Sequence, residues 1–169
     1  QAQPASAPRG VWFGTGKRDS KAKAISVSHN PRITGIIIMN AERQILSVNR
    51  AFWTGGSEGK LQIVKCGDCG EFTHPPQILC RHCQSENVEP TAVAGTGEVD
   101  TLTVNHQPWV KDLEVPYVIA RVRLDGVPGV YLTTNIVGCP VEEVNFDDKV
   151  CVTFEQQDDI YYPLFEKVS

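Results

Sequence analysis

Four of the six cysteines stand close together, in the stretch KCGDCGEFTHPPQILCRHC at residues 65–83. They form two Cys-x-x-Cys pairs, Cys66 with Cys69 and Cys80 with Cys83. Each pair can occupy a tight turn that directs both sulfur atoms at one point, and four thiolates at about 2.3 Å complete the tetrahedral shell of a zinc ion. Because the protein would fill that shell, leaving no place for water or substrate, we expect a structural zinc site.

Other interpretations of these cysteines are possible. Iron could occupy the same four thiolates, because a tetrahedral sulfur site does not by itself separate iron from zinc, but we favour zinc. Two disulfides would require an oxidising compartment, and the sequence shows no secretion signal. His74 and His82 lie near the pairs, and we interpret His82 as an exposed turn residue. Cys139 and Cys151 match no metal spacing and are expected to be buried or half-buried thiols without chemistry.

The charge of the chain is unevenly distributed. Residues 1–50 carry a net charge of +6 and the remaining residues a net charge of −10, which together give the −4 of the chain. An acidic body argues against binding to nucleic acid, since neutralising phosphates supplies most of that affinity. The longest apolar run, Ile36-Ile37-Ile38-Met39, is far too short to cross a membrane. We therefore expect a cytoplasmic protein with no membrane contact.

The chain divides into four segments by composition and pattern. Residues 1–39 are rich in small and basic residues and are expected to form a flexible linker or extension. Residues 40–59 are predicted to be helical, because Asn40 can cap a helix and apolar residues recur at helical spacing up to Phe52. The Gly55-Gly56 pair is expected to end that helix. Residues 60–92 then form the zinc ribbon, which begins with a strand over residues 60–65.

Residues 93–169 are rich in strand patterns. Candidate strands cover residues 96–106, 116–126, 129–138, 148–156 and 161–167. In the second strand, Ala120, Val122 and Leu124 alternate with Arg121 and Arg123, as expected where one face is buried. Five short antiparallel strands suit a small closed barrel, because closure removes exposed sheet edges. The fold class is therefore mainly β: a helical segment, a rubredoxin-like zinc ribbon and an OB-type antiparallel barrel.

No arrangement typical of an active site is visible in the sequence. There is no His-Asp-Ser order, phosphate-binding glycine loop or dinucleotide fingerprint. The loop NHQPWVKDLEVP at residues 105–116 is the most suggestive segment, because it carries His106 and Trp109. Trp109 is either an interface anchor, since aromatic residues dominate binding hot spots, or a cap on the barrel.

The ordered motifs resemble a known family, the acyl-CoA-associated proteins with a rubredoxin-like zinc ribbon and a C-terminal OB-fold. The matching stretches are AFWTGGSEGKLQIVKCGDCGEFTHPPQILCRHC, GTGEVDTLTVNHQP, VPYVIARVRLDG, TTNIVGCP and YYPLFEK. Together they cover about residues 49–169. Residues 1–40 match nothing in this family, and Gln84 stands where many members have glycine.

The resemblance implies an accessory role. Members look like partners of thiolase-fold enzymes that act on acyl-CoA thioesters, including lipid-transfer-protein-like aldolases of steroid side-chain degradation. An enoyl-CoA hydratase is a second possible partner, because it is often joined to, or encoded beside, such a domain. The acyl-CoA would then be met through the complex, and the chain alone is not expected to be catalytic. A nucleic-acid-binding zinc-ribbon/OB module is the alternative function.

Five aromatic or imidazole side chains are candidates for contact with the partner or its substrate. Two lie in the loop after the first barrel strand and three in the aromatic tail: His106, Trp109, Tyr161, Tyr162 and Phe165.

Overall fold

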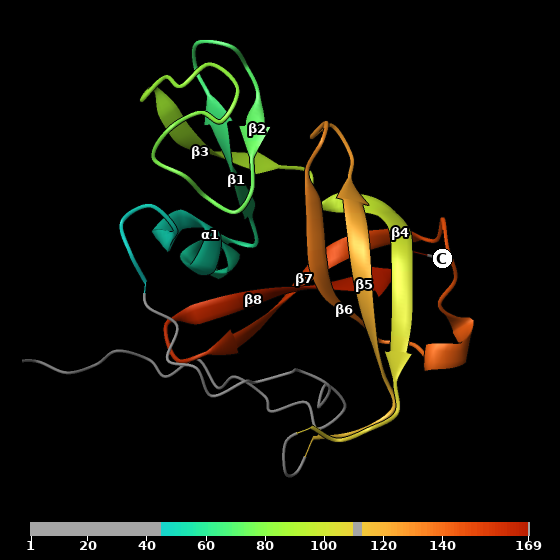
Figure 1. The fold of residues 1–169 in the computed structure, drawn as a ribbon. Helices are drawn as coiled ribbons and strands as arrows, with labels where there is room; N and C mark the ends of the chain where they lie inside the picture. Colours follow the sequence, from blue (N-terminus) through green and yellow to red (C-terminus); the bar gives the residue numbers. More distant parts are fainter. Residues whose placement is uncertain (1–44, 110–112, 169) are drawn as a thin grey trace, which may run out of the picture.

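A computed structural model describes residues 45–109 and 113–168 of the chain. The expected flexibility of residues 1–39 and the expected helix cap at Asn40 lie outside these residues. The described part contains a three-stranded sheet, one short α-helix and a closed five-stranded barrel (Figure 1). The expected order of helical segment, ribbon and barrel is confirmed.

Among the described residues the helical segment begins later than predicted and ends within one residue of the predicted end. The helix α1 covers only Arg50–Thr54, because the N–H of Leu46 donates to Oδ1 of Asn49 in the turn before it. The α-helix ends at the glycine pair, as predicted, with Gly55 as its C-cap, and a 3-10 helix, Gly55–Glu58, follows it. The pair also allows close packing: a Cβ on Gly56 would lie 2.5 Å from the Cβ of Tyr161.

The ribbon is a small antiparallel sheet. Its central strand β1, Leu61–Cys66, pairs with β2, Phe72–Thr73, on one side and with β3, Val88–Val93, on the other. Leu61 and Ile63 on β1 are almost completely buried. The strand that leads into the first metal turn is therefore also the strand that attaches the ribbon to the rest of the protein.

The barrel contains the five predicted strands, each within two residues of its predicted ends. Its members are β4 (Thr96–Asn105), β5 (Tyr117–Leu124), β6 (Tyr131–Val137), β7 (Lys149–Gln157) and β8 (Ile160–Lys167). They follow the order β4-β5-β6-β8-β7, and pairing between β4 and β7 closes the barrel. On β5 Ala120, Val122 and Leu124 are buried and the two arginines are exposed, as the alternation predicts.

One pair of barrel strands departs from the antiparallel prediction. Strands β6 and β8 are parallel, with Ile136 opposite Phe165 and Val137 opposite Glu166. The reason is topological: a closed ring with an odd number of strands cannot alternate in direction at every pair. Beyond these two register positions the ladder stops, and the Thr134 hydroxyl donates to the carbonyl of Pro163 at 2.7 Å.

A single hydrophobic core joins the ribbon to the barrel. Phe52 of α1 and Leu61 and Ile63 of β1 belong to the same buried cluster as barrel residues such as Val122 and Phe165. Burial of this apolar surface is the main stabilising contribution to the fold. Within the described residues, no helix has the length and apolarity needed to cross a membrane.

Candidate metal centre and contact surface

Two tight turns of the ribbon carry the four cysteines. In the first turn the N–H of Gly70 donates to the carbonyl of Cys66 at 2.9 Å, and in the second the N–H of Gln84 donates to the carbonyl of Cys80 at 2.9 Å. Gly70 and Gln84 have left-handed φ angles of +78° and +61°. A glycine accepts this conformation readily, while the glutamine at the second turn is less usual. The two Cys-x-x-Cys motifs therefore fold into equivalent turns.

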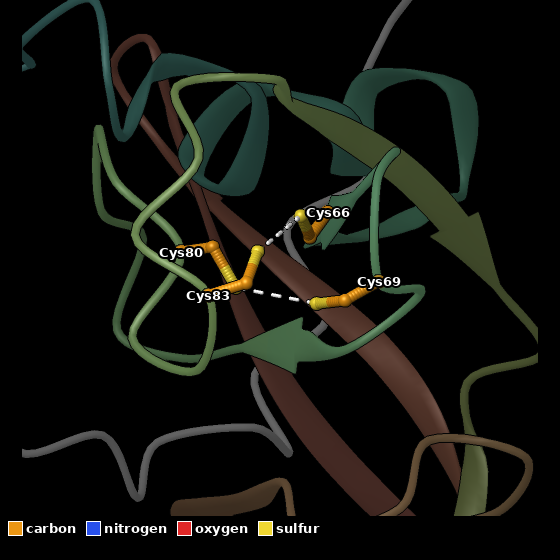
Figure 2. Close-up of side chains that lie close together, drawn as sticks. All are labelled: Cys66, Cys69, Cys80 and Cys83. Carbon is orange, nitrogen blue, oxygen red and sulfur yellow. Dashed lines mark hydrogen bonds between the residues drawn. The ribbon is translucent and has the colours of Figure 1, made fainter.

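The four cysteine side chains gather between these turns (Figure 2). The Sγ atoms of Cys66 and Cys83 lie 3.6 Å apart, those of Cys69 and Cys80 lie 3.5 Å apart, and all four lie within 4.8 Å of one another. Metal–sulfur bonds of about 2.3 Å in a tetrahedron place neighbouring sulfurs roughly 3.8 Å apart. None of the four forms a disulfide. The residues therefore fit a structural zinc ion with four protein ligands.

Backbone N–H groups favour the thiolate form of Cys80 in the second turn. The N–H of His82 lies 3.4 Å from Sγ of Cys80. Hydrogen bonds from the N–H groups of Cys83 and His82 lower the pKa of the Cys80 thiol to about 6. Because a cysteine binds metal as the thiolate, this turn prepares its sulfur for ligation.

A second set of hydrogen bonds joins the two turns outside the sulfur atoms. The carboxylate of Asp68 accepts from Oγ of Ser85 at 2.5 Å and from Nδ2 of Asn87 at 2.7 Å. We call this set the Asp68 bridge. The hydrogen bond from Ser85, and to a smaller extent the one from Asn87, lowers the pKa of the Asp68 carboxyl. Gly67 permits the close approach, because a Cβ there would lie 2.6 Å from Nδ2 of Asn87.

Sequence reasoning did not identify the Asp68 bridge. The signal was present, since an acid stands inside the first Cys-x-x-Cys motif and two hydrogen-bonding residues follow the second. Carboxylates and amides near metal ligands are common partners in an outer shell. The spacing alone could not show that the two turns approach each other with these side chains face to face.

The two ribbon histidines have different surroundings, and neither belongs to the sulfur cluster. His82 is exposed, as predicted. His74 is half-buried, its ring centroid lies 4.8 Å from that of Phe52, and burial lowers its pKa to about 4. Cys139 and Cys151 are half-buried, as predicted, and burial raises the pKa of Cys139. That shift disfavours a nucleophilic thiolate at Cys139.

Trp109 and His106 lie on the surface after β4. Trp109 is 71% exposed, so the interpretation that it caps the barrel is wrong. Its indole Nε1–H donates to Oδ1 of Asn105 at 3.2 Å, and Nδ2 of Asn105 is hydrogen-bonded to the hydroxyl of Tyr117. The exposed ring is therefore held to the barrel by its polar edge.

The aromatic tail is part of the barrel rather than a free extension. Phe165 has no exposed surface and lies in the core, so its predicted role as a contact residue is wrong. Tyr161 and Tyr162 are half-buried, and the ring of Tyr162 lies 5.8 Å from that of Trp53 in an edge arrangement. Sequence reasoning missed this difference because it treated the tail as a unit and did not assign a register to β8.

Several basic side chains on the barrel are paired with acids. Arg121 pairs with Asp100, and both Arg123 and Lys149 pair with Glu98. These pairs leave less unpaired positive charge for phosphate groups. The face formed by β4 and β5 is therefore poorly suited to nucleic acid.

Two family models match adjacent parts of the chain. The model described as the rubredoxin-like zinc ribbon domain of ChsH2 matches residues 53–89. The model described as the C-terminal OB-fold domain of ChsH2 matches residues 90–155. The two matches meet within β3 and correspond to the ribbon and the barrel.

Curated relatives include subunits and a scaffold protein. A probable enoyl-CoA hydratase alpha subunit of Thermomonospora curvata is 32% identical over 125 residues, which are 73% of this chain and 39% of that protein. A DUF35 domain-containing scaffold protein of Methanothermobacter thermautotrophicus is 30% identical over 95 residues, 54% of this chain and 69% of that one. The 3-oxo-4,17-pregnadiene-20-carboxyl-CoA hydratase alpha subunit of Mycobacterium tuberculosis is 34% identical over 74 residues, 44% and 24% of the two chains. The chain thus spans under half of either hydratase subunit.

Two solved structures share the architecture. A chain of the Ltp2-ChsH2(DUF35) aldolase has a TM-score of 0.66 and 29% identity, and the match covers 74% of this chain and 98% of that one. A DUF35-family protein of unknown function from Sulfolobus solfataricus has a TM-score of 0.52 at 20% identity over 72% and 86% of the two chains, which supports the fold alone. With its zinc ribbon, its OB-fold barrel and these matches, the chain belongs to the ChsH2 (DUF35) family.

Proposed function

We propose that the chain is a non-catalytic accessory subunit that binds a thiolase-fold enzyme acting on acyl-CoA thioesters. The most specific form of this proposal is an Ltp2-like retro-aldolase of steroid side-chain degradation. The observation that carries it is the match to 98% of a chain of the Ltp2-ChsH2(DUF35) aldolase. Because this match includes both ribbon and barrel, the two parts are shared as one unit.

The chemistry of the described residues supports a role without catalysis. The four clustered thiols suit a closed metal site, and Cys139 has a raised pKa. Burial keeps His74 neutral and lowers its pKa. A general base normally needs a nucleophile within hydrogen-bond reach, and the buried Nδ1 of His74 has no hydrogen-bond partner among the described residues. The partner would therefore supply the acid, base or nucleophile.

The surface near Trp109 is the proposed contact site. A specific interface buries roughly 800 Å² on each partner, and exposed aromatic rings at its centre dominate the energy. Trp109 offers such a ring in an orientation fixed by its hydrogen bond to Asn105. His106 is exposed beside it on the same loop.

A hydratase is a second proposed partner. Two relatives are named hydratase alpha subunits, and this chain matches only part of each. A complex in which the hydratase and the aldolase share this subunit would agree with both sets of relatives. Free thiols at the metal site suit a reducing compartment such as the cytoplasm, which we propose as the location of the complex.

The experiment is a titration of the zinc-loaded full chain with a labelled Ltp2-like aldolase. We expect a stable complex, and we expect cleavage of a bulky acyl-CoA by the mixture but not by the chain alone. Trp109→Ala should weaken association by about 2 kcal/mol, which is roughly thirtyfold in Kd. Glu142→Ala, an exposed acid outside the loop, should change Kd by a few tenths of a kcal/mol at most.

Three results would count against this proposal. Failure of the wild-type chain to bind the aldolase would remove the proposed partner. Equal affinity of wild type and Trp109→Ala would place that loop outside the interface. Turnover by the purified chain alone, abolished by substitution of one of its own residues, would show that it is itself an enzyme.

A further inference from the structure

A cavity of about 650 Å³ lies where the helix, the ribbon and the barrel meet. Its walls come from α1 and the turn before it, from the loop that follows β2, and from β5, β6 and β8. The elements that surround it can be followed in Figure 1. It is separate from the sulfur cluster, since none of the four cysteines lines it.

The cavity lies where the backbone ladder between the parallel strands β6 and β8 is missing, at the place where the Thr134 hydroxyl donates to the carbonyl of Pro163. Their ladder covers only residues 136–137 of β6 and 165–166 of β8. The residues that precede this ladder, 132–135 on β6 and 162–164 on β8, line the cavity. The closed ring of five strands therefore leaves an opening at its one parallel pair, and α1 lies across β8 beside it.

One wall of the cavity is a chain of rings. The ring of Tyr162 lies 5.8 Å from that of Trp53, Trp53 lies 4.8 Å from Phe52, and Phe52 lies 4.8 Å from His74. Pro75, Pro76 and Pro163 add further flat surfaces, and aliphatic side chains such as Leu132 complete the lining. Flat rings and prolines are well suited to stack against another flat apolar molecule.

No charged side chain of the described residues lines the cavity. His74 is the lining residue whose side chain ordinarily gains a charge just below neutral pH, but burial lowers its pKa to about 4, so that it is neutral near pH 7. Transfer of an isolated charge into such surroundings is strongly unfavourable. Uncharged polar side chains also line the cavity: Thr134 donates to the carbonyl of Pro163 and Asn135 to that of Val118, so the exposed hydroxyl of Thr133 and the remaining oxygen acceptors are the groups that can orient a ligand.

From this volume, lining and neutrality we infer that the cavity is a binding site for an uncharged, flat and mainly apolar molecule of small-ligand size. Clefts and cavities of about 300–1,000 Å³ that are mainly apolar and carry a few polar groups are typical of ligand sites. This site would act independently of the proposed partner interface, which lies at Trp109 and does not line the cavity. The inference holds whether or not the chain binds an aldolase.

The test is isothermal titration of the zinc-loaded full chain with 2-naphthol, a neutral fused-ring probe, and with 2-naphthalenesulfonate, its anionic analogue. We expect saturable binding of 2-naphthol and at least about tenfold weaker binding of the sulfonate, because a charge would be desolvated in the cavity. Thr133→Trp should fill the cavity from an exposed strand position and weaken 2-naphthol binding at least tenfold. Thr103→Trp, at an exposed position of β4 that does not line the cavity, should leave it unchanged.

Circular dichroism and zinc content would establish that each variant is folded. If Thr133→Trp does not fold, Leu46→Asp provides the same test, because Leu46 lines the cavity and is 53% exposed. No binding of 2-naphthol to wild type, equal binding by Thr133→Trp or Leu46→Asp, or equal affinity for the sulfonate would each overturn the inference.

Discussion

At the residue scale, Asp68 connects the two metal turns through hydrogen bonds that do not involve the metal. Its carboxylate holds Ser85 and Asn87, which follow the second metal turn, while its own backbone belongs to the first. The two turns are therefore joined by hydrogen bonds that do not require the four thiolates to coordinate the metal. A site joined in this way has less conformational freedom to lose when zinc binds.

Asp68→Ala should consequently weaken zinc binding by about ten- to a hundredfold, the usual effect of removing a hydrogen-bonding partner in the outer shell. Competition with a chromogenic chelator measures this affinity directly. Glu89→Ala, which removes an exposed acid of the same ribbon, is the matched control and should behave as wild type. An unchanged zinc affinity for Asp68→Ala would mean that the bridge does not position the cysteines.

His74 should make the stability of the fold depend on pH. Burial lowers its pKa in the folded chain from 6.5 to about 4, so between these values the unfolded chain binds more protons than the folded one. Stability is therefore retained above pH 6.5 and lost as the pH falls toward the folded pKa. The expected loss is about 2 kcal/mol between about pH 7.5 and about pH 5.

Urea unfolding of wild type and His74→Phe at these two pH values measures the difference. The variant should lose less stability on acidification, because it has no imidazole to protonate at that position. Acid also weakens zinc binding in both proteins, so the comparison rests on the difference between them. His106→Phe, at an exposed position, is the control. The same loss in wild type and His74→Phe would contradict the expectation.

At the element scale, the strands of the barrel were predictable, whereas the helix was predicted in the right region but not with its observed start. Alternation such as that of Val122 between Arg121 and Arg123 identifies a strand with one buried face, and Gly126 and Gly129 mark the hairpin that follows. These signals are local. The helical segment depends on packing, because Gly56 is needed for contact with Phe154 of β7 and Tyr161 of β8, and sequence spacing cannot show that contact.

The parallel pairing of β6 and β8 also could not be read from either strand. It arises from the closure of five strands into one ring, which is a property of the whole set. The metal ligands are the opposite case, since the spacing of Cys66, Cys69, Cys80 and Cys83 already identifies the cluster. The contact residues were predictable only in part. The exposure of Trp109 depends on the conformation of its loop, and the burial of Phe165 depends on the register of β8.

The hydrogen bond across the β6–β8 opening should stabilise the barrel. Thr134 donates its hydroxyl to the carbonyl of Pro163 at 2.7 Å in half-buried surroundings. Thr134→Val keeps the shape of the side chain and removes the donor, so the free energy of unfolding should fall by about 1 kcal/mol. Thr101→Val on the exposed face of β4 should change it little. Urea unfolding that gives equal stability for the two variants would contradict this role.

At the scale of the whole molecule, the ribbon and the barrel share one core. Leu61 and Ile63 of β1 are buried in the same cluster as the barrel interior, and Cys66 ends that same strand. Loss of the metal should therefore destabilise the barrel as well as the ribbon. If the first turn opens, the end of β1 loses its anchor, and the apolar surface that β1 buries against the barrel is weakened with it.

Cys83→Ser tests this coupling, because it removes one ligand at an exposed position without cutting into the core. We expect loss of zinc and a fall of about 3 kcal/mol or more in the free energy of unfolding, since structural zinc contributes of the order of 10 kcal/mol in isolated zinc modules. Tryptophan fluorescence, to which Trp12, Trp53 and Trp109 contribute, and far-ultraviolet circular dichroism should give one coincident transition. Cys139→Ser, which removes a half-buried thiol outside the metal cluster, should keep its zinc and most of its stability. A Cys83→Ser variant whose circular dichroism melts at the wild-type temperature would show that the barrel is stable without the ribbon.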